Sequence, residues 1–280
     1  VSYVLNNTPG QTITEETKER VKMAVKELGY TPNLIAKGLR SKQSRCIGVV
    51  NFWQLGDYVF ADVFKGICGA CERLDYYTMM CKSDIESCIS AFLSHQIAGL
   101  IIISPYFKNP NYQESEYIKN FTEHNIPCVI INGNTECEGV SYVNMDYFSN
   151  AYKATEYLIN LNHKKIAYLL PLGLKFTQEL CIEPSDYAKT VKQLINSESF
   201  TGVVANKAQY AHSFMELLKS ENILIPEDIS IISANFEPYA QYLSPPLTTV
   251  NLQTEQIGIV AVETLTNSLN SGITTISQTP

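Results

Sequence analysis

Residues 28–50 read LGYTPNLIAKGLRSKQSRCIGVV and join a small helical unit to a longer body of a different kind. Gly29 is a natural residue to end a helix, because glycine adopts the left-handed conformation that many helix ends need. Pro32 does not fit a helix interior, but it suits the first turn of a new short helix over residues 33–39. The run Ile47-Gly48-Val49-Val50 is apolar and of strand length, so it predicts the first buried strand of the body.

The two parts on either side of this junction carry opposite charge. Residues 1–45 hold eight Lys/Arg and four Asp/Glu, whereas the remaining residues hold 13 Lys/Arg and 24 Asp/Glu. The polar segment 41–45 is typical of a linker between them. A basic unit attached to an acidic body suggests a nucleic-acid contact at one end and a different task at the other.

The composition is that of a globular protein long enough to bury more than one core. The chain has 280 residues, of which 45% are hydrophobic and 18% are charged. The longest apolar runs, such as 100–103, are far shorter than a membrane span, so we expect no transmembrane segment. The eight cysteines form no dense regular framework, which favours a reducing cytoplasm.

The first helix has a recognisable start and one apolar face. Thr12 and Glu15 fit a capping box, with Thr12 as the N-cap and Glu15 three residues later. Apolar residues then recur at helical spacing, at Val21, Ala24, Val25 and Leu28.

Beyond residue 45, strand-like and helix-like runs alternate. Strands are expected at 47–50, 77–81, 100–104, 128–131, 165–170, 202–205, 229–234 and 248–251. Helices are expected at 60–74, 85–95, 114–124, 147–161, 187–195, 208–221 and 254–271. Apolar strands that alternate with helices predict parallel sheets covered on both faces, and the chain is long enough for two doubly wound units in series.

Ligands of such sheets bind beyond the carboxyl ends of the strands. The residues that follow the expected strands are therefore the candidates for a binding site. They are 51–60, Ser104, Asp146, Asn206 and Asn235.

Motifs along nearly the whole chain resemble those of one known family. They are VSYVLNN (1–7), EETKERV (15–21), ELGYTPN (27–33), NLIAKGLR (33–40), VNMDY (143–147), NHKKIAY (162–168), IPEDIS (225–230) and PPLTTV (245–250). In this order they resemble the LacI/GalR transcriptional regulators. The resemblance implies a partial, all-α helix-turn-helix headpiece and hinge helix over 1–45. It also implies a two-lobed α/β body like a periplasmic binding protein over 46–280.

The resemblance further implies that the N-lobe spans about 46–158 plus 254–274 and the C-lobe about 159–253. The match begins within the family's recognition helix, so we expect the preceding helix to be missing from these residues. The segment 172–176 also looks shorter than the family pattern, which usually places an effector-binding Arg there.

For DNA, the resemblance implies contacts from the recognition helix and the hinge. The candidate residues are Ser2, Tyr3, Asn6, Asn33, Lys37, Leu39 and Arg40. Leu39 matches the leucine that paired hinge helices push between base steps in the minor groove, while Lys37 and Arg40 would meet phosphates. The alternative is that Leu39 is a core residue of a short helix and that the basic face is only solvated.

For the effector, the resemblance implies a small molecule bound between the lobes. The candidate residues are Tyr58, Phe60, Ser104, Asp146, Asn206 and Asn235. Asn235 stands where the family usually has Asp, so the pocket should carry less negative charge than a typical sugar site. It should then suit an anionic or less hydroxyl-rich ligand, or bind no effector tightly. The alternative for Asp146 and Asn206 is that they only cap the helices that follow them.

The function expected from these residues is sequence-specific DNA binding by a homodimeric cytoplasmic regulator, a repressor, modulated by a sugar or related metabolite. The alternative is a periplasmic-type binding protein without DNA function. No catalytic motif, cofactor or metal site is expected. Cys68 and Cys71 have redox-like spacing, but a packed helix face is the simpler reading.

Overall fold

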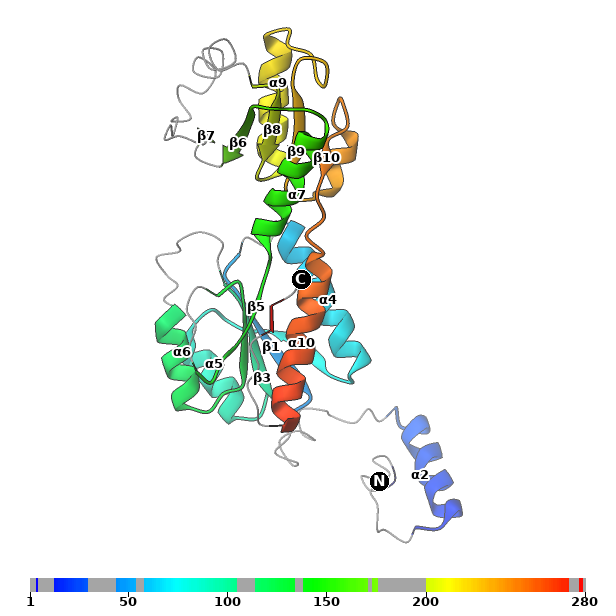
Figure 1. The fold of residues 1–280 in the computed structure, drawn as a ribbon. Coiled ribbons are helices and arrows are strands. Elements are labelled where there is room, and N and C mark those ends of the chain that lie inside the picture. Colours follow the sequence, from blue (N-terminus) through cyan, green and yellow to red (C-terminus); the bar gives the residue numbers. More distant parts are fainter. Residues whose placement is uncertain are drawn as a thin grey trace.

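In the computed structural model, two sheets with helices on both faces make up the body of the chain (Figure 1). The structure describes residues 4, 13–29, 44–53, 58–104, 114–133, 138–170, 173–175, 200–271 and 277–278. The expected helix at 187–195 lies outside these residues.

The first sheet has the strand order β11-β5-β4-β3-β1-β2, and all of its neighbours are parallel. Its strands are β1 (Cys46–Asn51), β2 (Tyr77–Met80), β3 (Gly99–Ile103), β4 (Cys128–Ile131), β5 (Ser141–Asn144) and β11 (Ser277–Gln278). The predicted parallel sheet is therefore confirmed. The strands β5 and β11 were not expected, because β5 contains polar residues and β11 is only two residues long.

The central strand β3 shows how both faces of this sheet are buried. Ile101 and Ile103 face one core, whereas Leu100 and Ile102 face the other, as side chains in a strand alternate. The first core lies under α4 (Tyr58–Arg73) and α10 (Thr254–Ser271). The second lies under α5 (Ile85–Leu93) and α6 (Glu114–Glu123), on the opposite side of the sheet (Figure 1).

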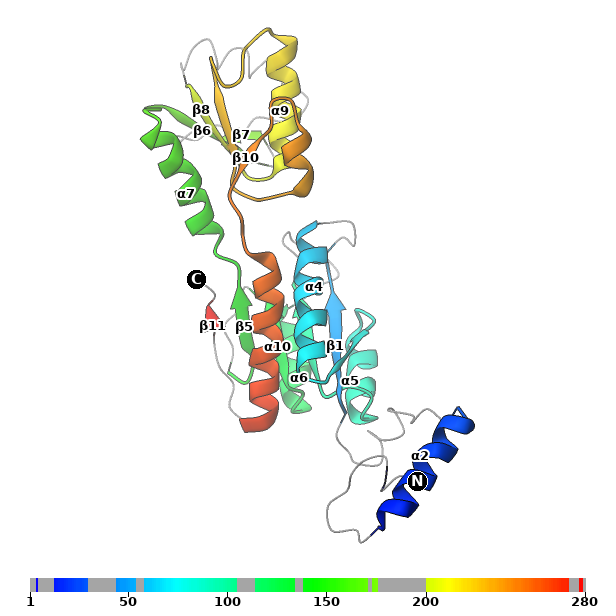
Figure 2. The ribbon, with the colours of Figure 1, turned by 90° about the vertical axis from the view of Figure 1, so that its right-hand side faces the viewer.

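The second sheet has the strand order β10-β9-β8-β6-β7. Its strands are β6 (Ile166–Leu170), β7 (Gly173–Lys175), β8 (Gly202–Ala205), β9 (Ser230–Ser233) and β10 (Thr248–Thr249). Three of its four pairings are parallel, but the edge strand β7 runs antiparallel to β6 and was not expected. One face carries α7 (Tyr147–Asn160) and the other α9 (Ala208–Ser220), and the short 3-10 helix η2 (Pro238–Tyr242) precedes β10 (Figure 2).

Two described segments connect the sheets, one from β5 to α7 and one from β10 to α10 (Figure 2). The polypeptide leaves the first unit near residue 145, builds the second, and returns near residue 252. Because α10 belongs to the first unit, that unit is assembled from two separated parts of the chain.

The return helix α10 crosses α4 at a point where only glycine fits. A Cβ added to Gly66 would lie 2.0 Å from the carbonyl oxygen of Glu255, and one added to Gly258 would lie 2.0 Å from that of Val63. The two backbones are therefore in direct contact. Such an approach needs residues without side chains on both helices.

The headpiece helix α2 (Glu15–Glu27) differs from the expected one at its start. Its N-cap is Thr14, not Thr12, because the extended backbone of Thr14 lets its hydroxyl oxygen accept a hydrogen bond from Thr17 N at 3.4 Å. None of the side chains of α2 is buried. Among the described residues, no helix is long and apolar enough to cross a bilayer.

Candidate functional site

The carboxyl ends of β1 and β3 are tied together by Trp53. Its indole N–H donates to the carbonyl oxygen of Ser104, and its backbone N–H donates to Oδ1 of Asn51 at 2.9 Å. Ser104 is fully buried, and its hydroxyl donates to the carboxylate of Glu114 at 3.3 Å. This predicted effector residue therefore already has a partner within its own lobe.

The carboxyl ends of β8 and β9 are tied by Asn235, which is buried. Its Nδ2 donates to the carbonyl oxygen of Asn206 at 2.7 Å. The hydroxyl of Ser233 donates to the carbonyl oxygen of Asn235 at 2.7 Å. On the α7 side, Nδ2 of Asn150 donates to the carbonyl oxygen of Ala234 at 3.1 Å. These bonds fix the strand ends, and they place Asn206 and Asn235 side by side.

Asp146 and Asn206 differ in their relation to the helices that follow them. Asp146 is exposed and is the N-cap of α7, where its carboxylate accepts hydrogen bonds from the hydroxyl and the backbone N–H of Ser149. These two bonds lower the pKa of Asp146. Asn206 does not cap α9: Lys207 holds that position and makes no side-chain cap bond. The capping alternative therefore describes Asp146 but is wrong for Asn206.

The two aromatic residues predicted for the effector lie in different environments. Phe60 is buried and stacks on Phe64 with ring centroids 5.7 Å apart, within the core under α4 and α10. Tyr58 begins α4 and meets Phe236, beyond β9, edge to face at 5.9 Å. Tyr58 thus contacts the second unit, whereas Phe60 stacks on a ring of the first unit.

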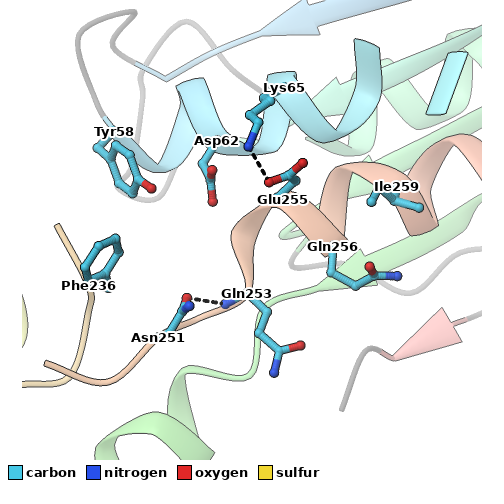
Figure 3. A pocket seen from close by; sticks show the side chains of 9 residues that line it. All are labelled: Tyr58, Asp62, Lys65, Phe236, Asn251, Gln253, Glu255, Gln256 and Ile259. Carbon is cyan, nitrogen blue, oxygen red and sulfur yellow. Dashed lines mark hydrogen bonds and ion pairs between the residues drawn. The ribbon is translucent and has the colours of Figure 1, made fainter. Parts of the chain in front are cut away.

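A pocket of about 390 Å³ lies where α4, the returning segment and Phe236 meet (Figure 3). Its lining residues are Tyr58, Asp62, Lys65, Phe236, Asn251, Gln253, Glu255, Gln256 and Ile259. Of the predicted effector residues it contains Tyr58 alone.

Charged and polar pairs hold the walls of this pocket in place. The ammonium of Lys65 pairs with the Glu255 carboxylate at 2.7 Å, and the hydroxyl of Thr254 donates to the Asp62 carboxylate. Burial, followed by the charge of Asp62, raises the pKa of the Tyr58 hydroxyl. Sequence reasoning missed Asp62 and Lys65, although their spacing from Tyr58 places all three on one face of α4.

All of the residues predicted to contact DNA lie outside the described part of the chain. They are Ser2, Tyr3, Asn6, Asn33, Lys37, Leu39 and Arg40.

Of the two cysteines on α4, Cys71 lies on the packed face of the helix, whereas Cys68 is half-buried. Cys71 is buried in the core, and burial raises the pKa of its thiol, which opposes formation of a nucleophilic thiolate. Across the described ranges, no group of three or more His, Cys, Asp or Glu side chains is arranged to hold a metal ion.

Comparison with known families matches the two parts of the chain separately. Residues 1–33 match the model of bacterial regulatory proteins of the lacI family, and residues 173–279 match that of a periplasmic binding protein-like domain.

Curated relatives match over nearly the full length. The transcriptional regulator RegA of Clostridium saccharobutylicum is 24% identical over 96% of this chain and 88% of its own. The repressor PurR of Vibrio atlanticus (strain LGP32) is 27% identical over 95% of this chain and 86% of its own.

Solved structures share the fold at lower identity. The lac repressor dimer bound to operator and the anti-inducer ONPF has a TM-score of 0.75 at 20% identity, covering 99% of this chain and 91% of that one. The regulator CelR in complex with cellobiose has a TM-score of 0.66 at 18% identity, covering 99% and 90%.

Proposed function

From the membership of this chain in the LacI/GalR family of transcriptional regulators, we infer that it is a sequence-specific DNA-binding repressor. Its operator affinity is modulated by a small metabolite, and it acts as a homodimer in the cytoplasm. This inference rests on one observation. The same chain combines an N-terminal segment that matches the lacI family with a two-sheet body that matches periplasmic binding proteins. A periplasmic-type binding protein does not account for that headpiece.

The chain divides into a headpiece over 1–45 and a body over 46–280. The packing of α7 supports a lobe boundary near Asp146 instead of residue 158, because Ala154 and Leu158 pack against Val204 of β8 and other residues of the second sheet. The C-lobe then spans about 146–253. The N-lobe comprises the residues between 46 and the boundary, together with 254–274.

The effector binds at the facing carboxyl ends of the strands of both lobes. Ser104 on the first sheet and Asn206 with Asn235 on the second support this placement. Ser104 and Asn206 follow a strand directly, Asn235 lies two residues beyond one, and such strand ends form the ligand sites of open parallel sheets. Phe60 and Asp146 complete the set of proposed contacts, and Tyr58 lies at the rim. Closing the lobes on a ligand biases the hinge between its ordered and disordered states.

Operator selection from random duplexes, followed by affinity measurements with and without a metabolite panel, tests this function. We expect one enriched, near-palindromic sequence and at least one metabolite that changes its affinity. Failure to enrich any sequence contradicts DNA recognition. Enrichment with affinity unchanged across the panel contradicts only the effector response.

Leu39 provides the sharpest test of how DNA is bound. Leu39→Ala should weaken operator binding and reduce DNA bending, because the proposed wedge between base steps is lost. Ser41→Ala, in the polar linker beyond, serves as the matched control. Bending by Leu39→Ala equal to that of the unchanged protein excludes insertion of this side chain.

The dimer is proposed to form along the edge strand β2. Tyr77 and Met80 on this strand are 55% and 46% exposed, and Leu93 on the neighbouring α5 is 58% exposed. An edge with exposed apolar side chains is a surface for pairing with another strand. Tyr77→Asp should shift the protein to monomer in sedimentation velocity, whereas Ser213→Asp, at an exposed position of α9 in the other lobe, should leave the dimer intact.

A further inference from the structure

The outward face of α7 carries a stripe of exposed apolar side chains. Phe148, Tyr152 and Ile159 are 80%, 57% and 56% exposed. The other side of the helix packs on the second sheet through Ala154 and Leu158. Because successive residues turn by about 100° around a helix, the exposed and the packed sets lie on opposite sides. The stripe therefore faces away from the sheet, on the far side of it from α9 (Figure 2).

The spacing of the stripe is that of a helix which packs against another helix. Phe148, Tyr152, Thr155 and Ile159 follow one another at intervals of four, three and four positions, as the seam residues of paired helices do. The hydroxyl of Thr155 donates to the carbonyl oxygen of Ala151 at 2.8 Å, so it brings no unpaired polar group into the seam. Single exposed apolar side chains are common on protein surfaces, but a continuous line of them marks an interaction surface.

The size of the stripe indicates a weak contact. Its three large apolar side chains expose roughly 350 Å² in each copy, which is near the lower limit for surface patches that mark interaction sites. Two such stripes together would bury roughly 700 Å², less than the area of a stable interface. A pairing through this face should therefore depend on protein concentration.

Two opposite charges lie along one flank of the stripe. Lys153 and Glu156 are both exposed and lie one helical turn apart. Among the described residues, neither forms an ion pair within the chain. The Glu156 carboxylate accepts a hydrogen bond from the hydroxyl of Tyr152 at 3.3 Å, which holds it beside the seam. The flank thus offers both a cation and an anion to a partner.

We propose that α7 pairs with α7 of a second copy of this chain. The two helices run antiparallel, about a twofold axis that passes between residues 153 and 154. Such an axis sets the same flank of both helices face to face. Lys153 of each copy then lies within one turn of Glu156 of the partner copy, and this ion pair forms twice.

The dipoles of the two helices favour the same direction. In the antiparallel order, the positive N-terminal end of each helix lies beside the negative C-terminal end of the other. A parallel pair would place like ends together. The surface is therefore complementary to itself in its apolar seam, its flanking charges and its helix dipoles.

The α7 contact is separate from the dimer proposed along β2. The strand β2 is an edge of the first sheet, whereas α7 covers one face of the second. One chain can make both contacts, so dimers should join into larger assemblies as the concentration rises. This association does not depend on operator binding, and either can fail without the other.

Sedimentation velocity of the full chain over a concentration series tests the pairing. We expect the sedimentation coefficient to rise with concentration above that of the dilute species. Ile159→Asp should weaken this association at least tenfold, because it places a charge in the seam. Leu224→Asp, at a position of similar exposure (58%) beyond α9, is the matched control and should leave the association unchanged.

Charge reversal distinguishes a second copy of α7 from any other partner surface. Lys153→Glu should weaken the association about tenfold, because each pair becomes a repulsion between like charges. Lys153→Glu combined with Glu156→Lys should restore it, since the reversed pairs attract again.

Three outcomes overturn the proposal. The first is a sedimentation coefficient that does not rise with concentration. The second is an association that Ile159→Asp leaves in place, and the third is a double charge reversal that associates no better than the single one.

Discussion

The headpiece helix α2 and the return helix α10 form for different reasons. Local signals define α2: Thr14 caps it, and Lys18 pairs with Glu15 at 2.6 Å, yet none of its side chains is buried. Tertiary contacts define α10, because Ile257 and Leu265 are buried in the first core and Gly258 touches the backbone of α4.

The headpiece helix and the body therefore differ in what stabilises them. Surface ion pairs and caps contribute little individually, so α2 needs another surface, such as operator DNA or further headpiece residues, to become rigid. The body carries its own cores. We therefore expect changes at the α4–α10 crossing and at the strand ends to alter the stability of the body, and changes in α2 to leave it unaltered.

The largest effect should come from the glycine crossing. Gly66→Leu places a side chain where even a Cβ would lie 2.0 Å from a backbone oxygen, so α4 and α10 must separate. We expect a loss of about 4 kcal/mol or more in the free energy of unfolding, measured by urea denaturation. Gly69→Ala is the matched control in the same helix, because its Cβ would meet nothing within 4 Å. Equal stability of the two variants contradicts direct backbone contact.

The next effect should come from the tie between the strand ends. Asn235→Asp replaces the Nδ2 donor with a buried carboxylate facing the Asn206 carbonyl, at a cost of about 3 kcal/mol near neutral pH. Burial raises the pKa of the introduced carboxyl in the folded state. Its protonated form is therefore favoured in the folded state, and the deficit should be smallest below pH about 4 and grow as pH rises. Denaturation at several pH values measures this; a deficit independent of pH contradicts the burial of this side chain against the Asn206 carbonyl.

A smaller effect should come from the cap of α7. Asp146→Ala removes the acceptor for Ser149 and should cost about 1 kcal/mol. Because the pKa of Asp146 is lowered, the contribution of its charged form is present above the unfolded pKa and is lost as pH falls through the lower folded value. Asp146→Asn keeps a capping side chain and should retain most of the stability. If that variant nevertheless loses effector binding, Asp146 has a role beyond the cap.

The smallest effect on the body should come from the cap of α2. Thr14→Ala should weaken this helix by about 0.5–1 kcal/mol, observed as faster amide exchange over residues 15–27, with the Tm of the body unchanged. Thr14→Ser keeps the hydroxyl and should exchange like the unchanged protein. A fall in the Tm of the body with Thr14→Ala indicates that the two parts are coupled.

Much of the fold was predictable from the sequence. The strand expected at 100–104 lies at 99–103, because burial on both sides of a parallel sheet leaves an uninterrupted apolar run. The helix expected at 254–271 lies at those residues, as its apolar pattern predicted. The strands β7 and β11 were missed, since they are short edge strands whose pairing depends on the rest of the sheet. The capping-box spacing from Thr12 to Glu15 predicted the wrong N-cap, because only the backbone path shows that Thr14 takes this role.

The candidate site was predictable in position but not in detail. Residues that follow the expected strands were the candidates for the site, and the structure joins two of them, Asn206 and Asn235, by a hydrogen bond. The tie between them depends on the backbone of one strand end meeting a side chain from the next, which no pattern in the sequence specifies. Phe236 was likewise not predicted, because only the fold brings its ring into contact with Tyr58 of the other lobe.

The contact between α4 and α10 also determines when the first lobe can fold during synthesis of the chain. The partner of Gly66 in this contact, Glu255, lies 189 positions later, so a ribosome completes the whole inserted lobe before the first lobe can close. Until then, the apolar face of α4, including Val63 and Ile67, has no helix beside it. A nascent chain that stops before residue 254 should therefore present this face to chaperones or aggregate, while its C-lobe is already folded.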